Sequence, residues 1–457
     1  MKKIKSFSFV FLLLLSLSFQ AQTKKWTLEE CVNYALKNNI SIKQSELDTK
    51  TADIDKKSAR GNFLPSLNAN SSHSWNVGLN QDITTGLLRN QTTQFTSAGA
   101  SLGVTIYNGL QNQNQLRRAN LSIVASKYQL LKMQEDIALN IANAFLQVLF
   151  NKENLKVQQE QLAIDKKQLI RSEELVATGS VPRGDLLDMK ATVALDIQRE
   201  IAADNALLIS KLSLSQLLQL PDFEYFDISD ETSVNDTNNI LGQTPTAIYI
   251  KSKEIKTELK IASANLEIAQ KNVAIAKAGF QPVLQGFYSF SSRVSYADVL
   301  DFDPVTKNLI GTTGAAPFFN QFNDNKGQSF GVQLSVPIFN GFSVRNNVER
   351  SKVNLEKSKI ALEQQEIDLQ RNVFTAFADA KGALKGYESS IITLDARQEA
   401  YIYAKEKYAV GMMNSFDFNQ SQTLLTNAQS EVLRTKYDYI FKIKILEFYF
   451  GIPIAKN

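Results

Sequence analysis

Residues 109–178 read GLQNQNQLRRANLSIVASKYQLLKMQEDIALNIANAFLQVLFNKENLKVQQEQLAIDKKQLIRSEELVAT, a segment with no proline and no glycine after Gly109. Apolar or small residues occupy every seventh position within it, at Leu116, Ile123, Leu130, Ile137 and Ala144. At 1.5 Å per residue, a helix of roughly 70 residues would be on the order of 100 Å long. Heptads sustained over that length predict a coiled coil or a barrel of helices rather than a helix of a globular domain.

A second copy of this segment follows 232 residues later (116 to 348). Its heptad positions hold Val348, Leu355, Leu362, Leu369 and Ala376. Upstream, Phe63 and Phe280 match at an offset of only 217, so the second copy carries 15 additional residues (232 against 217) between these positions and its long helix. The length alone would suggest about three globular domains, but the internal duplication indicates two matching halves instead.

The composition excludes several classes of protein. Charged residues make up 21% of the chain, and no apolar run of about 18 residues follows the N-terminus, so a polytopic helical membrane protein is excluded. The net charge of +4 includes three lysines in a segment that we expect to be removed, which leaves no basic excess for binding nucleic acid. His73 and Cys31 are the only histidine and cysteine and provide no metal site. Because nucleophile–base pairs and phosphate loops are also missing from the sequence, we predict no cofactor and no enzymatic activity.

The N-terminus has the features of a secretory signal. Three lysines within the first five residues precede an apolar run from Phe7 to Phe19 that is broken only by serines, and Ala21 offers a small residue for cleavage. We therefore predict a signal peptide at residues 1–21. The alternative, a membrane anchor, is disfavoured because the apolar run is short.

Two stretches in each half alternate between apolar and polar residues with a period of two. In the first half they begin near Phe63 and near Ala98, and each is about ten residues long with one apolar face and one small, polar face. In the second half, Phe280-Gln-Pro-Val-Leu284 repeats the pattern of Phe63-Leu-Pro-Ser-Leu67. This alternation is typical of transmembrane β-strands, although it is a weak signal for any single strand.

Helical and strand patterns together divide the chain into two repeats. Thr27 and Glu30 predict a capping box at the first helix, and a helical pattern continues from Ile40 to Arg60. The predicted ranges are a first repeat at 22–220 with a hairpin at 63–107, a long helix at 109–178 and a return helix at 185–220; a linker or equatorial segment at 221–245; and a second repeat at 246–457 with a helix at 246–278, a hairpin at 280–339, a long helix at 341–410 and a return helix at 416–450.

Four membrane-type strands are too few to close a barrel. An open sheet edge in lipid would leave backbone N–H and C=O groups unpaired at several kcal/mol each, so the chain must form oligomers. Three chains would supply about twelve strands, an even number within the range of known barrels. The predicted fold class is therefore α plus transmembrane β, in which a trimer forms a 12-stranded β-barrel that a long α-helical barrel continues.

The order of these elements, given twice, resembles the TolC-like outer-membrane efflux protein family over essentially the whole mature chain. The matching motifs are Thr27-Leu-Glu-Glu-Cys-Val-Asn-Tyr-Ala-Leu-Lys-Asn-Asn39, the two Phe-x-Pro-x-Leu strand starts, Ile106-Tyr-Asn-Gly109 with its copy Ile338-Phe-Asn-Gly341, and the Gly-x5-Asp turns that begin at Gly179 and Gly411. The resemblance implies a homotrimeric exit duct in outer-membrane lipid that spans the periplasm. It also implies a periplasmic adaptor (membrane fusion) protein and an inner-membrane pump as partners, with the pump deciding the cargo.

The resemblance also implies roles for the turns between long and return helices. Contacts with the adaptor would involve Gly179, Ser180, Val181, Pro182, Arg183, Gly184, Gly411, Met412, Met413 and Asn414. The alternative for the two glycines is a plain left-handed helix stop, and both roles can hold at once. The family pattern has a basic residue two positions after Gly411, where this chain has Met413. Arg183 of the other turn could take the place of that basic residue.

The same resemblance implies a pore constriction at the start of the return helices. Its candidate residues are Asp185, Asp188, Asp417, Gln420 and Tyr408. Gln420 stands where the family has a second carboxylate, so the ring of negative charge would be weaker than in the family pattern. The alternative for Asp185 and Asp417 is ordinary helix N-terminal capping.

Aromatic residues on the strands are candidates for the belt at the membrane surface. They are Trp75, Tyr288 and Tyr296, for which packing within the barrel is the alternative. Two other functions fit the long helices alone, a periplasmic coiled-coil adaptor and a structural coiled-coil scaffold. Neither explains the alternating strands at the base of both helices, so an outer-membrane exit duct is the preferred interpretation.

Overall fold

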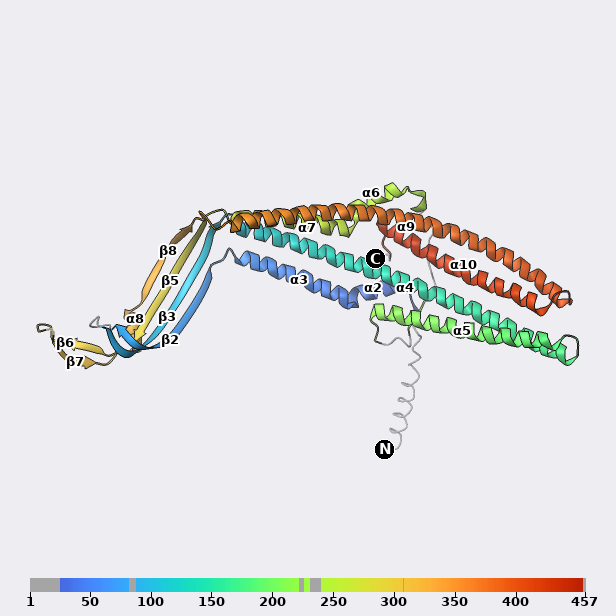
Figure 1. Cartoon of the computed structure of the whole chain (residues 1–457), viewed down its shortest axis with the longest axis horizontal. Coiled ribbons are helices and arrows are strands. Elements are labelled where there is room, and N and C mark those ends of the chain that lie inside the picture. Colours follow the sequence, from blue (N-terminus) through green and yellow to red (C-terminus); the bar gives the residue numbers. More distant parts are fainter. Residues whose placement is uncertain (1–24, 82–87, 222–225, 231–239, 307, 455–457) are drawn as a thin grey trace, which may run out of the picture. The chain divides into compact units, whose positions relative to one another are not determined.

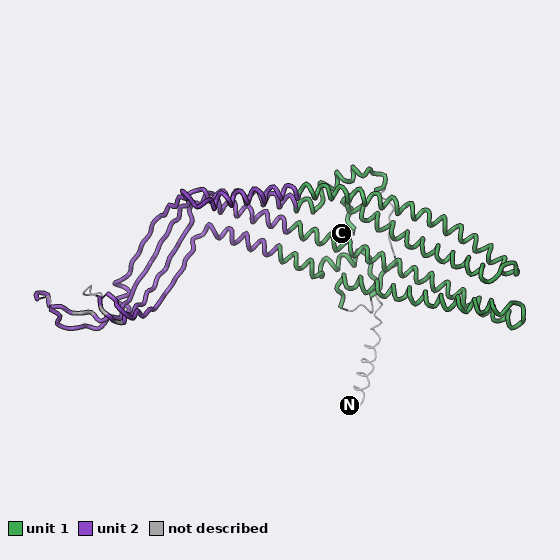
Figure 2. Tube along the Cα trace, in the orientation of Figure 1, with its two compact units in different colours: residues 1–48, 127–261, 362–457 green, residues 49–126, 262–361 purple. Residues whose placement is uncertain are grey.

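The computed structural model describes residues 25–81, 88–221, 226–230, 240–306 and 308–454, and the predicted signal peptide lies outside these ranges. The chain forms two compact units (Figure 2). Residues 1–48, 127–261 and 362–457 form one, called here the helical unit, and residues 49–126 and 262–361 form the other, the sheet unit. Both sequence repeats contribute to both units.

The first repeat contains four helices: α2 (Leu28–Asn38), α3 (Ile40–Gly61), α4 (Gln111–Ala177) and α5 (Arg183–Leu218) (Figure 1). The predicted capping box is confirmed: the Thr27 hydroxyl accepts from the Glu30 N–H at 3.2 Å, and the Glu30 carboxylate accepts from the Thr27 N–H at 3.1 Å. Helix α3 is separated from α2 by Asn39, whose backbone is extended at ψ 130°. The Asn39 side chain accepts from the Ser41 N–H at 2.9 Å and so restarts the helix.

The second repeat has the matching helices α6 (Pro245–Ile255), α7 (Thr257–Ala278), α9 (Ser343–Ala409) and α10 (Ser415–Phe450). The prediction of one continuous helix at 246–278 was wrong, because the backbone is extended at Lys256 with ψ 130°. Lys256 corresponds to Asn39 at the offset of 217, so the break is part of the duplicated plan. The buried Lys256 ammonium lies 2.9 Å from the centre of the Phe448 ring. This cation–π contact stabilises the break between α6 and α7.

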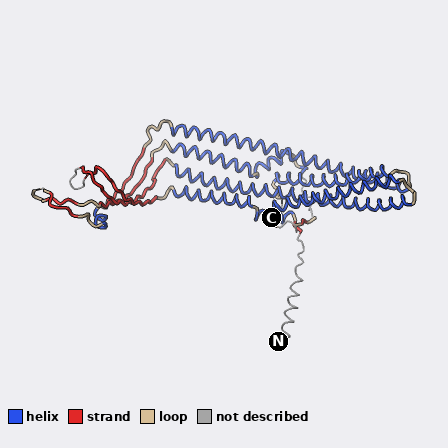
Figure 3. The backbone as a smooth tube through the Cα atoms, turned by 60° about the horizontal axis from the view of Figure 1, so that its bottom comes forward, coloured by secondary structure: helices blue, strands red, loops and turns tan. Residues whose placement is uncertain are grey.

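The sheet unit contains a four-stranded antiparallel sheet in the order β2-β3-β5-β8 (Figure 1), and Figure 3 shows its strands in red. Their bounds are Ser66–Gln81, Leu88–Asn108, Val283–Ser295 and Gly327–Ser335. The first hairpin lies close to its predicted range of 63–107, but its strands are longer than the ten or so residues expected, because the polar residues between the two alternating stretches pair as strand up to Gln81 opposite Leu88. Backbone hydrogen bonds hold such a ladder together, so polar side chains do not end it.

The second hairpin, predicted at 280–339, contains further elements in its outer part. These are β6 (Val299–Phe302), β7 (Leu309–Thr313) and the short helix α8 (Phe318–Asp324). Strand β8 ends at Ser335, so the alternating residues that follow it up to Ile338 are not strand. The additional residues of the second repeat are thus folded rather than irregular.

The predicted linker at 221–245 also carries structure. Strand β4 (Asp227–Ile228) pairs in parallel with β1 (Lys25–Trp26), and a 3-10 helix, η1, spans Ile240–Gly242. Ile228 is fully buried in the core that α4 provides with Ile141 and Phe145. Strand β4 therefore packs onto the core of the helical unit. Among the described residues, no helix combines the length and the apolar content that a membrane crossing needs.

Candidate functional site

The four-stranded sheet has two chemically different faces. Because side chains alternate along a strand, the pairing register assigns each residue to one face. One face carries Leu67, Leu102, Val104, Tyr288, Phe330, Val332 and Leu334, and the other carries Ser66, Asn68, Asn70, Ser101, Gly103, Ser289, Ser329 and Gln333. Phe330 remains 82% exposed in the single chain, so the apolar face has no cover of its own there. One such face suits lipid and the other suits water.

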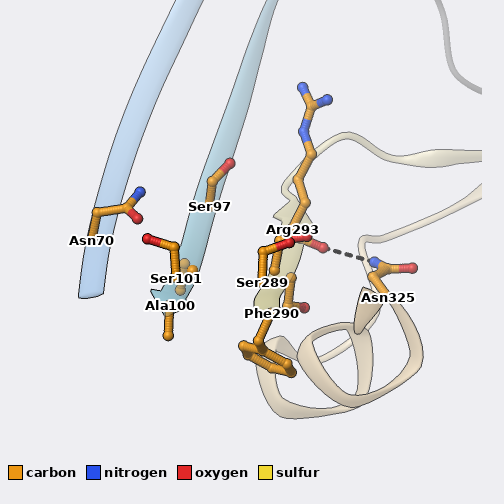
Figure 4. A pocket seen from close by; sticks show the side chains of 12 residues that line it. Asn70, Ser97, Ala100, Ser101, Ser289, Phe290, Arg293 and Asn325 are labelled. Carbon is orange, nitrogen blue, oxygen red and sulfur yellow. Dashed lines mark hydrogen bonds between the residues drawn. The ribbon is translucent and has the colours of Figure 1, made fainter. Parts of the chain in front are cut away.

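The polar face is hollowed around Gly99 (Figure 4). Ser97, Ser101 and Arg293 point to this side, whereas Phe290 points to the opposite side of the sheet. A Cβ atom at Gly99 would lie 3.2 Å from the Phe290 carbonyl oxygen, so glycine leaves the room that the hollow needs. The Arg293 guanidinium lies 3.6 Å from the centre of the Phe95 ring on the same face.

Two of the three predicted belt residues lie together on the apolar face. The His73 ring contacts Trp75 and Tyr296, with ring centres 4.3 and 5.5 Å apart. Thr96 joins the group, since its hydroxyl lies 2.8 Å from His73 Nδ1 and 3.0 Å from the Tyr296 hydroxyl. Tyr288 lies eight residues earlier on β5, opposite Leu102, and is separate from this cluster.

Both tip turns have the same geometry. Gly179 and Gly411 each have φ +75°, a conformation that favours glycine. Backbone bonds from Ser180 N–H to Leu175 O (2.9 Å) and from Met412 N–H to Lys407 O (2.8 Å) close the ends of α4 and α9. This is the Schellman pattern, in which the last carbonyls of a helix are satisfied by the reversal. The glycines are therefore explained by backbone geometry, whatever else the turns contact.

The return helices start earlier than predicted, and their caps are not the aspartates. Helix α5 begins at Arg183 with Pro182 at its N-cap, and α10 begins at Ser415 with Asn414 at its N-cap. The Asn414 amide oxygen accepts from the Asp417 N–H at 2.8 Å, and its Nδ2 donates to the Asp417 carboxylate at 2.9 Å. Asp417 is thus the third residue of the helix, where its charge complements the helix dipole.

The candidate constriction residues differ in their exposure within the single chain. Asp188, Asp417 and Gln420 are exposed, while Asp185 and Tyr408 are half-buried. Burial, followed by the nearby Asp185 carboxylate, raises the pKa of Tyr408.

The Tyr408 ring stacks on Phe418, with ring centres 4.6 Å apart and planes 11° apart. Phe418 is 1% exposed and also contacts Tyr401. Sequence reasoning missed Phe418, which anchors Tyr408 of α9 to α10.

A row of polar side chains joins α10 to α4 in the helical unit. Gln422 Nε2 donates to Asp165 Oδ1 at 2.6 Å, and the Thr426 hydroxyl donates to Gln161 Oε1 at 2.8 Å. One turn further, Gln158 Nε2 donates to Ser430 Oγ at 3.4 Å. The three residues of α10 are spaced by four, so they share one face of the helix. We call these three hydrogen bonds the polar seam.

Asp165 of the polar seam lies beside a second buried carboxyl group, that of Asp196. Asp165 of α4 is fully buried and Asp196 of α5 is 3% exposed. Burial, and then the neighbouring Asp196 carboxyl, raises the pKa of Asp165 to about 7. Asp196 Oδ1 accepts from Arg199 at 3.1 Å, and no protein group donates to Oδ2 among the described residues. A proton on Asp165 removes the repulsion between the two carboxylates and lets them share a hydrogen bond, which is why the pair favours the protonated form.

The seam was not predicted, although the heptad pattern contains its signal. The series that starts at Leu116 and Ile123 continues as Asn151, Gln158 and Asp165, so the buried stripe becomes polar toward the tip. Besides Gln161 of the same helix, Asp165 has two partners on other helices, 31 and 257 positions away (165 to 196 and 165 to 422). A heptad stripe that changes from apolar to polar identifies such a position, but it does not identify the partner.

Comparison with known proteins agrees with this architecture. A family model described as outer membrane efflux protein matches residues 31–219 and 251–444, one segment in each repeat. The chain is 22% identical to the outer membrane protein TolC of Vibrio cholerae over 319 residues, 68% of this chain and 66% of that protein. It is 23% identical to TolC of Escherichia coli over 438 residues, 93% of this chain and 82% of that protein.

The fold is also similar to that of a solved outer-membrane channel. The structure of the Campylobacter jejuni CmeC channel superposes with a TM-score of 0.78 at 18% identity, over 94% of this chain and 87% of that chain. The family match covers both repeats, and the two-faced sheet fits a membrane environment. The chain belongs to the outer membrane efflux protein family, and its location is the outer membrane.

Proposed function

We propose that three copies of this chain form a closed 12-stranded barrel in the outer membrane, continued by their helices as an exit duct through the periplasm. The observation that carries the proposal is the sheet with one apolar and one polar face, whose terminal strands are β2 and β8. In lipid, the outer edges of these strands need partners from other chains. Closure would place Ser101 and its polar neighbours around a water-filled passage and Leu102 against lipid.

The duct would operate as the outer part of a tripartite export system. A periplasmic adaptor protein would contact the turns at 179–184 and 411–414, and an inner-membrane pump would supply the energy and select the cargo. Opening would move the return helix α10 away from α4, which requires separation of the polar seam. Asp417, at the first turn of α10, would then move away from the axis of the duct together with that helix.

Cross-linking at the strand edges tests the barrel. Asn68→Cys on β2 and Ser329→Cys on β8 lie at the same level of the sheet, three strand spacings or roughly 14 Å apart within one chain. With a short bis-maleimide, we expect covalent species of two and three chains and none larger. Burial raises the pKa of the Cys31 thiol to about 12, so the native cysteine stays protonated and does not compete.

The pair Ser101→Cys and Ser289→Cys is the matched control. These residues face each other on the central strands β3 and β5, so their link forms within one chain and adds no higher species. Cross-linked species that end at two chains, or that continue beyond three, would contradict the trimeric barrel. Absence of all cross-linked species in a detergent in which the control link still forms would contradict it as well.

Asp417→Asn is expected to lower the cation preference of the channel in planar bilayers. Three copies of an exposed carboxylate at the aperture would attract cations, and the amide removes that charge while it keeps a hydrogen-bonding group beside Asn414. We expect the permeability ratio of potassium to chloride to fall by about two-fold or more. Gln420→Ala, a neutral change on the same helix, serves as the control. An unchanged ratio in Asp417→Asn would remove Asp417 from the constriction.

A further inference from the structure

Helix α8 lies beside the last residues of β5, where the neighbouring strand β8 is absent. Strand β8 begins at Gly327, opposite Ser291, so the outer residues of β5 have no β8 partner. Side chains of α8 and of the residue after it take this place. Gln321 accepts from the Ser295 N–H and donates to the Ser295 carbonyl, both at 2.9 Å, and Asn325 Nδ2 donates to the Arg293 carbonyl at 2.8 Å (Figure 4). The helix is therefore fixed to the sheet.

The contacts of α8 place it on the apolar side of β5. Phe322 lies against Phe290, with ring centres 6.1 Å apart, and the Ser292 hydroxyl donates to the Phe322 carbonyl at 2.7 Å. Phe290 and Ser292 both belong to the apolar face, opposite Ala100 and Ala98 of β3. The polar hollow lies on the other side of the sheet, so α8 does not line it with its aromatic rings.

The exposed surface of α8 combines two phenylalanine rings with polar side chains. Phe318 stacks on Phe322 with ring centres 6.1 Å apart and also contacts Phe319 edge to face at 5.4 Å. Phe319 is 81% exposed and Phe318 is 39% exposed. The helix, FFNQFND, has one charged residue, Asp324, and so no basic groups that would hold it to phosphate. An ordered aromatic surface of this kind needs an apolar cover.

The position of α8 along β5 indicates what covers its aromatic rings. Its contacts extend from Phe290 to Ser295, directly before Tyr296, which belongs to the aromatic group of Trp75 and His73. Aromatic side chains collect where hydrocarbon meets headgroups, and short amphipathic helices lie in that plane. The rings of α8 continue the apolar face of the sheet at its outer end.

We propose that α8 is an interfacial helix that inserts Phe318 and Phe319 among the acyl chains of the outer leaflet, beside the barrel wall. This rests on the proposed barrel. The helix is part of the second hairpin, the one that carries the additional residues of the second repeat. A closed barrel of three chains would carry three such helices around its outer rim. Each would bind lipid through aromatic contact rather than through charge.

Fluorescence quenching by brominated lipid tests the insertion. In a Trp26→Phe, Trp75→Phe background, Phe319→Trp provides a single fluorophore on an exposed position that tolerates the larger ring. The purified oligomer is reconstituted into phosphatidylcholine vesicles whose acyl chains carry bromine near the headgroup or deep in the bilayer. We expect quenching by the shallow bromine to exceed quenching by the deep bromine by about two-fold, because interfacial helices sit roughly 5–10 Å into the acyl boundary.

Two further variants separate failure of this proposal from failure of the barrel. Phe330→Trp lies on the apolar face and should be quenched by lipid, whereas Phe287→Trp lies on the polar face and should not. Quenching of Phe330→Trp without quenching of Phe319→Trp would overturn the interfacial role of α8 and leave the barrel intact. If Phe330→Trp is not quenched, the sheet does not face lipid, and both proposals fail.

Discussion

Leu102→Arg is expected to prevent the chain from assembling in the outer membrane. Leu102 lies near the middle of β3 on the apolar face, between Leu67 and Tyr288. An arginine on the lipid face costs about 2–4 kcal/mol at the midplane of the bilayer, and a trimer would carry the cost three times. We expect the folded oligomer in the outer-membrane fraction to fall at least about ten-fold, since each 1.4 kcal/mol corresponds to a factor of ten.

Ser101→Arg is the matched control, one residue away on the opposite face. Its neighbours are Asn68 and Ser289, and in the proposed barrel its side chain would reach water. We expect this variant to assemble at the level of the unaltered chain and to change conductance instead. If both arginines are tolerated, or both abolish assembly, the assignment of the two faces is wrong.

Asp165→Asn is expected to remove a pH dependence from the helical unit. The folded chain keeps a proton on Asp165 up to about pH 7, whereas in the unfolded chain the group has its ordinary value of 3.8. Folding therefore binds a proton between these values, and the contribution of Asp165 to stability is greatest below about pH 4. That contribution falls by about 1.4 kcal/mol per pH unit until the folded group ionises, and it is constant above that pH. The amide stays neutral at every pH, so the stability of the variant relative to the unaltered chain should rise by roughly 2–3 kcal/mol between pH 5 and pH 8.

Hydrogen exchange of the backbone amides around Gln422 from pH 5 to pH 8.5 measures this effect locally, after correction for the intrinsic rate. Groups that face Asp165 come from each neighbouring helix: Asp196 with Arg199 from α5, and Tyr401 from α9, whose pKa is raised by burial and then by the Asp165 charge. Asp204→Asn, which removes an exposed carboxylate from α5, is the control and should keep the pH dependence. A pH profile of Asp165→Asn that parallels the unaltered chain would contradict the proposed protonation.

Much of the fold follows from residue patterns that occur once in each of the two repeats. The heptads from Leu116 and Val348 predicted the two long helices, and the alternation around Leu102 predicted the two-faced strands. The helix breaks at Asn39 and Lys256 were not predicted, because each depends on a contact with a distant element. Asn39 donates to the Leu217 carbonyl at 3.2 Å, and Lys256 lies over Phe448.

The site was less predictable than the fold for the same reason. The glycines at the tips could be recognised because their conformation is local, with φ +75° at Gly179 and at Gly411. The stacking of Tyr408 on Phe418 and the pairing of Asp165 with Asp196 join separate helices, and no spacing within one helix encodes them. The roles of the tip residues in binding an adaptor and in ion selectivity stay predictions.

In the proposed opening movement, the polar seam is the contact that would have to break and re-form. If α10 moved away from α4, Gln422 and Thr426 would exchange their partners for water, at a cost of only about 0.5–1.5 kcal/mol per hydrogen bond. The apolar core around Phe145 has no such substitute and would therefore act as the fixed pivot of that movement. A contact that water can replace would close again without aggregation, so the proposed duct could open many times while the rest of the helical unit stayed folded.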